Sequence, residues 1–219
     1  MTRGTTDGKM PPAPILTGNR MARPREFDEQ VVLDALVHCF WSRGYEATSV
    51  RDLIERTGLT GASLYNAFGD KRALYRRALD HYVEAGTADR IRRCEAMEPL
   101  QAIRAFFDEI LRRSLDDGER KGCMLVNAAL EAAPDDEASR AAVTGALLRL
   151  ETFFLESLRE GQASGTITSA FAAEDLARHL LGVLMGVRVL ARTRPEPALL
   201  AGVVAPALAL LEPVRARQG

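Results

Sequence analysis

The sequence has few of the residues on which disulfide-rich and metal-binding proteins depend, and it has no long hydrophobic run. Its three cysteines, Cys39, Cys94 and Cys123, are odd in number and far apart, without CxxC spacing, so we expect neither a disulfide framework nor a metal site. The longest apolar run, Ala198–Leu211, is 14 residues long, whereas a membrane-spanning helix needs about 20. Because residues 1–20 also lack the apolar core of a signal peptide, we expect a cytoplasmic protein without a membrane partner.

An excess of charge of one sign is also missing. The 29 basic and 30 acidic residues give a formal net charge of -1, which by itself disfavours a nucleic-acid partner. The distribution is uneven, however. Residues 1–93 carry 15 basic and 12 acidic residues, a net of +3, whereas residues 94–219 carry 14 and 18, a net of -4. This asymmetry indicates two parts with different partners and a boundary near residue 93.

Proline is absent between Pro24 and Pro99, where apolar residues recur at helical spacing between glycines that can end helices. The pattern predicts helices over residues 28–43, 50–57, 60–68 and 70–93, capped at Thr48 or Ser49, at Thr60 and at Asp70. The rest of the chain predicts helices over 99–115, 122–132, 135–161, 174–192 and 195–211. We therefore expect an all-α fold of about nine helices.

Thr48–Lys71 has the pattern of a helix-turn-helix. Two short helices are joined through Gly58–Leu59, and their apolar residues Leu53, Ile54 and Leu64 are spaced to pack inward with Leu59. In such a motif the second helix enters the major groove of DNA with its N-terminal residues near the base edges. The second helix here begins with four small residues, which let its backbone approach DNA closely: Thr60, Gly61, Ala62 and Ser63.

Groups suited to phosphate surround this motif. Helix N-termini present unpaired N–H groups, Tyr65 offers a hydroxyl, and Lys71 lies in the first turn of the next helix. Arg23 and Arg25 lie on an arm that can enter a minor groove. Short helix–glycine–helix patterns also occur as plain scaffold in helical bundles, but this combination favours DNA binding. The predicted DNA contacts are Arg23, Arg25, Thr48, Ser49, Thr60, Gly61, Ala62, Ser63, Tyr65, Asn66 and Lys71.

Phe27–Tyr75 resembles the DNA-binding domain of TetR-family transcriptional regulators over about fifty residues without a gap. The most specific matches are Phe40, Gly44-Tyr45, Thr48, Gly58-Leu59, Leu64-Tyr65, Phe68 and Lys71. The resemblance implies a homodimeric repressor of a palindromic operator, released by a small apolar effector. By the same resemblance, phosphates are contacted by Thr48, Thr60, Ser63, Tyr65 and Lys71, while Asn66 contributes to base reading. Gly61 departs from the lysine that is frequent in the family at this position.

The resemblance and the charge boundary together give the expected organisation. Residues 1–22 are a disordered extension, part of which need not belong to the native protein. Residues 23–70 are the DNA-binding domain, 71–93 a connecting helix, and 94–213 a bundle for effector binding and dimerisation. We expect no enzyme and no cofactor, because His38, His81 and His179 are scattered and no GxSxG, HExxH or P-loop motif is present. An enzyme on a helical bundle and a protein-binding adaptor are the alternatives.

The last two helices are more apolar than one protomer core needs, which favours a two-fold four-helix interface over burial within the monomer. Gly182 and Gly186, at GxxxG spacing, would let a partner helix approach. The predicted interface residues are Leu180, Gly182, Leu184, Gly186, Val203 and Leu208.

A cavity for an effector is expected in the bundle, although apolar residues at helical spacing also form ordinary core. Its predicted lining is Phe106, Phe107, Met124, Asn127, Phe153, Met185 and Arg188. Arg188 lies in an apolar helix and needs a partner, either a ligand anion or a carboxylate such as Glu156. Cys123, near a helix N-terminus, is either a reactive thiol or, as its apolar surroundings favour, a buried structural residue.

Overall fold

Every regular element in this computed structural model, which describes residues 27–131 and 136–213, is helical. The first helices are α1 (Glu29–Ala47), α2 (Val50–Thr57) and α3 (Gly61–Phe68). A continuous helix follows, made of α4 (Lys71–Tyr82), the π-helical η1 (Val83–Ala88) and α5 (Asp89–Cys94). The others are α6 (Pro99–Leu115), α7 (Met124–Glu131), α8 (Glu137–Ser164), α9 (Ala173–Thr193) and α10 (Pro197–Ala209). With α4, η1 and α5 taken as one helix, the described ranges contain the nine helices predicted.

Local sequence signals place the ends of the early helices. Ser49, Thr60 and Asp70 are the N-caps of α2, α3 and α4, and each side chain accepts a hydrogen bond from the backbone N–H three residues on. Gly44 interrupts α1 with φ 81°, and Gly58 ends α2 with φ 69°. Both glycines adopt the positive φ that other residues avoid, as expected of helix C-caps.

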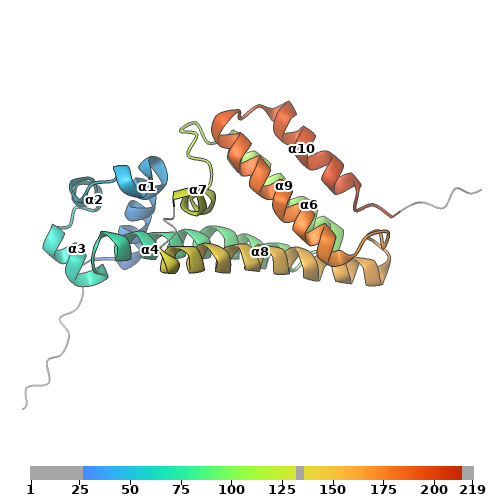
Figure 1. Ribbon diagram of the computed structural model, residues 1–219, viewed down its shortest axis with the longest axis horizontal. Helices are drawn as coiled ribbons and strands as arrows, with labels where there is room; N and C mark the ends of the chain where they lie inside the picture. Colours follow the sequence, from blue (N-terminus) through green and yellow to red (C-terminus); the bar gives the residue numbers. More distant parts are fainter. Residues whose placement is uncertain (1–26, 132–135, 214–219) are drawn as a thin grey trace, which may run out of the picture.

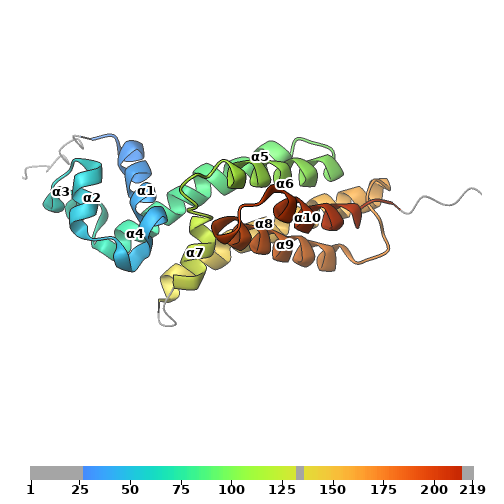
Figure 2. The same ribbon diagram turned by 90° about the horizontal axis from the view of Figure 1, so that it is seen from above.

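The helices form an elongated molecule in which α4 leads from one end into the other (Figures 1 and 2). Helices α1, α2 and α3 make up one end, and α8 runs beside the long α4–η1–α5 helix. Helices α6, α8 and α9 enclose the main core, with α10 on the outside against α9 and α6. Helix α7 lies between α1 and α8 and so bridges the two ends.

Two groups of aromatic side chains hold these parts together. Phe40 of α1 meets Tyr75 of α4 edge to face, with ring centroids 5.2 Å apart. In the main core Phe107 of α6 stacks on Phe154 of α8 at 5.8 Å. Such pairs add about 0.5–1.5 kcal/mol to the free energy gained by burial alone. No helix in the described ranges is long and apolar enough to cross a membrane.

Two glycines of α8 have opposite surroundings, which gives a test of the core packing. A Cβ on the buried Gly161 would lie 2.4 Å from Ile167 Cδ1, whereas one on Gly145 would meet no atom within 4 Å. We expect Gly161→Ala to lower the free energy of unfolding by about 1–3 kcal/mol through overpacking. Gly145→Ala should raise it by about 0.5–1 kcal/mol, because alanine favours the helix. Urea denaturation measures both, and equal changes in the two variants would contradict this packing.

Candidate nucleic-acid interface and an adjoining cavity

The helix-turn-helix forms as the sequence predicts. Leu53 of α2 and Leu64 of α3 are fully buried, while Ile54 and Leu59 pack against the same core with part of their surface exposed. Gly58 turns the chain between the helices and donates its N–H to the Ile54 carbonyl at 2.9 Å. Apolar packing therefore fixes α3 on α2 with its opposite face in solvent.

Helix α3 presents its small and polar residues outward at the end of the molecule (Figure 1). Thr60 caps the helix, and its hydroxyl lies 2.9 Å from that of Ser63. Tyr65 is 40% exposed one turn further on. The exposed residues of the helix and its cap are Thr60, Ala62, Ser63, Tyr65 and Asn66, with Gly61 half-buried beside them. The structure thus brings these predicted contacts onto one surface.

The N-terminus of α2 lies on the same end of the molecule. Ser49 accepts a hydrogen bond from the Asp52 N–H, and the Asp52 carboxylate accepts one in return from the Ser49 N–H at 2.8 Å. Hydrogen bonds from the Ser49 hydroxyl and N–H, and then from Arg43, lower the pKa of Asp52 to about 2. The capping box is therefore charged at neutral pH, and Ser49 remains exposed beside it.

Thr48 has a different role from the one predicted. Its side chain is completely buried, and its hydroxyl donates to the Gly44 carbonyl at 2.6 Å. This hydrogen bond closes the chain reversal after the break in α1, so the hydroxyl points into the protein. The prediction that Thr48 offers its side chain to phosphate is wrong, because that side chain is buried. The exposed N-cap of α2 is Ser49.

Lys71 lies at the start of α4, as predicted, and its ammonium group contacts α1. The Nζ atom lies 4.5 Å from the centre of the Tyr45 ring and 3.5 Å from the Glu46 carbonyl oxygen. These contacts position the charge near the end of α1, which is negative by the helix dipole. Arg23 and Arg25 lie outside the described residues.

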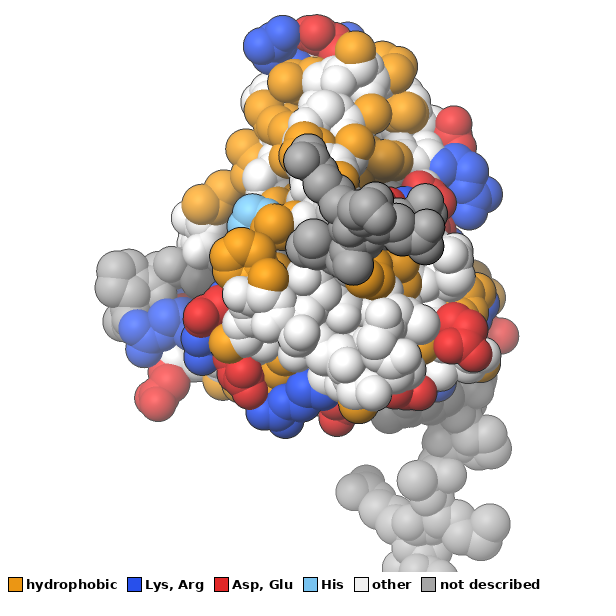
Figure 3. Space-filling view, turned by 90° about the vertical axis from the view of Figure 1, so that its right-hand side faces the viewer, with side chains coloured by type: hydrophobic (Ala, Val, Ile, Leu, Met, Phe, Trp, Pro, Cys, Tyr) orange, Lys and Arg blue, Asp and Glu red, His pale blue; other side chains and the backbone are white. Residues whose placement is uncertain are grey.

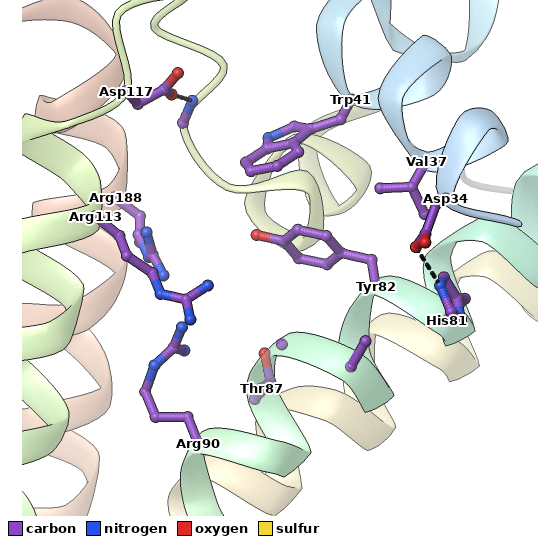
Figure 4. A pocket seen from close by; sticks show the side chains of 13 residues that line it. Asp34, Val37, Trp41, His81, Tyr82, Thr87, Arg90, Arg113, Asp117 and Arg188 are labelled. Atoms are coloured by element: carbon purple, nitrogen blue, oxygen red, sulfur yellow. Dashed lines mark hydrogen bonds and ion pairs between the residues drawn. The ribbon is translucent and has the colours of Figure 1, made fainter. Parts of the chain in front are cut away.

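A cavity of about 330 Å³ separates the helix-turn-helix end from the bundle (Figure 4). Trp41 of α1 and Tyr82 of α4 form one side of it, and Arg90, Arg113 and Arg188 form another. Residues Ala85, Gly86 and Thr87 of η1 also border the space. A π-helical segment inside an α-helix often accompanies a functional site.

Of the residues predicted to line an effector cavity, only Arg188 borders this one. Phe106, Phe107 and Phe153 pack with Phe154 as core, and Met124 is 1% exposed in the same core. Phe153 also borders a separate open hollow of about 560 Å³ between η1, α5 and α8. Asn127 donates to the Lys121 carbonyl at 3.1 Å. Met185 and Phe106 border only a void of about 10 Å³ next to Arg188. Apolar spacing identified core and missed Trp41, Tyr82, Arg90 and Arg113, which come together only through tertiary packing.

The partner of Arg188 is not Glu156. The Arg188 guanidinium instead donates to the Ser114 hydroxyl at 3.4 Å, and Arg188 faces the cavity beside Arg90. Burial, followed by the charge of Arg188, lowers the pKa of Arg90. Like charges are therefore held close together on the wall of this cavity.

The other candidate residues of the bundle have structural surroundings. Cys123 is 7% exposed and accepts a hydrogen bond from the Tyr82 hydroxyl at 3.6 Å, which favours the structural interpretation. Within the described ranges no cluster of His, Cys, Asp or Glu could hold a metal ion.

The predicted dimer residues divide into two sets. Leu180, Leu184 and Leu208 are buried inside the protomer, so their side chains cannot meet a partner and this part of the prediction is corrected. Gly182 and Gly186 face open space, since a Cβ on either would meet nothing within 4 Å. Val203 is half-buried on α10. Hydrophobic side chains gather on the upper part of Figure 3, the side on which α10 lies.

Comparison with known proteins agrees with this architecture. Residues 32–78 match the family model described as "Bacterial regulatory proteins, tetR family", and residues 99–205 match "Tetracyclin repressor-like, C-terminal domain". The chain is 33% identical over 165 residues to an uncharacterized HTH-type transcriptional regulator, YezE, of Bacillus subtilis, covering 73% of this chain and 84% of that protein. It is 30% identical over 172 residues to the HTH-type transcriptional repressor ComR of Escherichia coli, covering 78% and 82%.

Solved structures show the same fold. A cysteine mutant of the TetR family transcriptional regulator CifR, complexed with 26-bp double-strand operator DNA, superposes with a TM-score of 0.76 at 34% identity. The similarity covers 85% of this chain and 98% of that one. The family models, the relatives and the fold agree: the chain belongs to the TetR family and is a DNA-binding transcriptional regulator, not an enzyme.

Proposed function

We propose that the protein is a dimeric repressor that binds a palindromic operator through α3 and is released by a small effector. The exposed, capped α3 at one end of the molecule carries this proposal, together with the CifR–operator complex of the same fold. Residues 23–70 serve as the DNA-binding domain, 71–93 as the connecting helix and 94–213 as the effector-binding and dimerisation domain.

Helix α3 has the chemistry of a major-groove reader. Gly61 and Ala62 at its start let the backbone approach the base edges, and Thr60 and Ser63 bring hydroxyl groups. Tyr65 and Ser49 are exposed beside this helix and would contact flanking phosphates, and Lys71 adds a positive charge. Phosphate contacts position such a helix, while contacts with base edges from its first turn, and from Asn66, specify the sequence.

Helices α9 and α10 supply the dimer surface. Gly182, Gly186 and Gly202 all face open space on these helices, so that a second copy could pack with its helix backbones close. A two-fold axis through this surface would let the two α3 helices enter successive major grooves. The two helices would then be about 34–36 Å apart, or a multiple of that distance.

The effector acts through the cavity between α1 and the bundle. The sequence suggested an apolar effector, and Val37, Trp41 and Tyr82 supply apolar wall, while the arginines make the rest of the wall polar. Beyond the cavity, α7 reaches α1, where the Glu131 carboxylate accepts a hydrogen bond from the Tyr45 N–H at 2.9 Å. An effector that prefers one spacing of α1 and α9 would therefore shift the orientation of the helix-turn-helix and weaken operator binding.

Tyr65→Ala tests the DNA surface. Removing a neutral hydroxyl contact with phosphate should weaken binding about tenfold on operator and on unrelated DNA alike, and should leave its salt dependence unchanged because the lost group carries no charge. Met97→Ala is the matched control, because Met97 is 46% exposed but lies between α5 and α6, away from α3. Fluorescence anisotropy at several salt concentrations measures both variants. Wild-type affinity in Tyr65→Ala would remove Tyr65 from the interface.

Gly182→Arg tests the dimer surface. A side chain at Gly182 points into open space in the protomer, so we expect the fold to persist while close approach of a partner helix is blocked. Analytical ultracentrifugation should then show monomers, and operator affinity should fall. Gly145→Arg, which also introduces arginine into open space, serves as the control on α8. A Gly182→Arg protein that stays dimeric would place the interface elsewhere.

A further inference from the structure

We propose that the cavity between α1 and α9 binds a small organic acid, with its carboxylate on Arg113 and Arg188 and its planar apolar part against Trp41 and Tyr82. This inference rests on the proposed function, in which the same cavity holds the effector. The effector class is thus an aromatic carboxylate rather than a neutral apolar molecule.

Three guanidinium groups converge on this cavity from three helices (Figure 4). Arg90 comes from α5, Arg113 from α6 and Arg188 from α9. Glu109 lies 3.1 Å from Arg90 and 2.8 Å from Arg113, and its other oxygen is 2.8 Å from Arg93. Of the three arginines at the cavity, Arg90 and Arg113 therefore share one carboxylate, while Arg93 also pairs with Asp89 outside it.

Arg188 is the least compensated of the three. Its contact is the neutral Ser114 hydroxyl at 3.4 Å, although the side chain is half-buried. A guanidinium in such surroundings is stabilised by a bidentate anion, because the charge-assisted hydrogen bonds replace the water it has lost. Together, Arg113 and Arg188 can hold one carboxylate between α6 and α9.

The acidic residues that border the cavity are engaged elsewhere. The Asp117 carboxylate accepts a hydrogen bond from the Gly122 N–H at 3.1 Å. Asp34 lies 2.7 Å from His81, on the side of the cavity away from the arginines (Figure 4). Asp117 is therefore held by the backbone, and Asp34 is paired with His81; neither forms an ion pair with Arg113 or Arg188.

The opposite side of the cavity fits a flat apolar group. The Trp41 and Tyr82 rings meet at a centroid distance of 5.1 Å and an interplanar angle of 64°. The buried Trp41 Nε1 finds no acceptor among the described residues, and buried donors of this kind are normally hydrogen-bonded. Burial raises the pKa of Tyr82, so its hydroxyl stays protonated and keeps its hydrogen bond to the Cys123 Sγ, leaving the ring as apolar wall. Indole and guanidinium donors around about 330 Å³ select an acceptor-rich ligand of modest size.

Isothermal titration of the full-length protein tests this inference with matched acids and amides. The probes are benzoate and 2-naphthoate, with benzamide and 2-naphthamide as neutral counterparts and inorganic phosphate as a plain anion. We expect saturable binding of at least one acid at millimolar concentration and none of its amide. Arg188→Met and Arg113→Met should each weaken it about 10- to 100-fold, the range for a lost charged hydrogen bond.

Arg112→Met is the matched control, since Arg112 is exposed on α6 next to Arg113 and does not border the cavity. Arg113 has a 55% exposed side chain, so Arg113→Met remains informative even where Arg188→Met fails to fold. The inference is overturned if neither acid binds, if the amides bind as tightly, if phosphate alone binds, or if Arg113→Met binds the acid like the parent protein.

Operator binding without any acid is measured on the same samples and tests the proposed function separately. If the protein binds operator but neither acid, this inference is overturned and the proposed operator binding is not. A protein that binds an acid through Arg113 but no operator supports the inference and overturns the proposed role as an effector-released operator repressor.

Discussion

The packing of α1 against α4 is the constraint on which the rest of the molecule depends. Leu36 of α1 and Leu74 and Ala78 of α4 are fully buried, and Phe40 meets Tyr75 between the same helices. Because α4 continues through η1 into α5, this contact ties the DNA-reading end rigidly to one wall of the cavity. A change on that wall therefore reaches α3 without any flexible link in α4.

The cavity lies where the two ends of the molecule can influence each other. Its apolar side belongs to α1 and α4, and its cationic side belongs mainly to α6 and α9. Repulsion between Arg90 of α5 and Arg188 of α9 favours separation of these two helices, and a bound anion would reduce that repulsion. The Glu131–Tyr45 hydrogen bond adds a second connection, through α7, between the bundle and the end of α1.

Local features of the fold could be predicted from the sequence because they depend on neighbouring residues. Ser49, Thr60 and Asp70 begin helices through their own side chains, and Gly44 and Gly58 end them through positive φ. The helical spacing of the apolar residues in α3 also predicts which of its faces is exposed. The role of Thr48 cannot be predicted in this way, because Thr48 and Ser49 are equally suited to cap α2. Only tertiary packing shows that the threonine hydroxyl turns inward.

Features made by distant residues could not be predicted in this way. Arg90, Arg113 and Arg188 are separated by tens of residues, and no spacing rule brings them together. The residues predicted to line the cavity, such as Phe107, are apolar residues at helical spacing. Residues of a solid core and residues around a pocket have this same spacing. Helix α9 is apolar around most of its circumference, so the sequence could not distinguish the buried Leu184 from the outward Gly186.

The distance between the two α3 helices in the dimer tests the central claim most directly. A nitroxide label on Glu55→Cys of α2, an exposed position that is not a predicted DNA contact, can be introduced selectively because Cys39, Cys94 and Cys123 are buried. Since α2 packs on α3, pulsed electron paramagnetic resonance then reports the separation of the two helix-turn-helix ends. With operator DNA the distance should be single and narrow. Saturating aromatic acid should shift it in the parent protein but not in Arg113→Met. An unchanged distance in the parent protein with the acid fully bound would contradict coupling between the cavity and the DNA-reading helices.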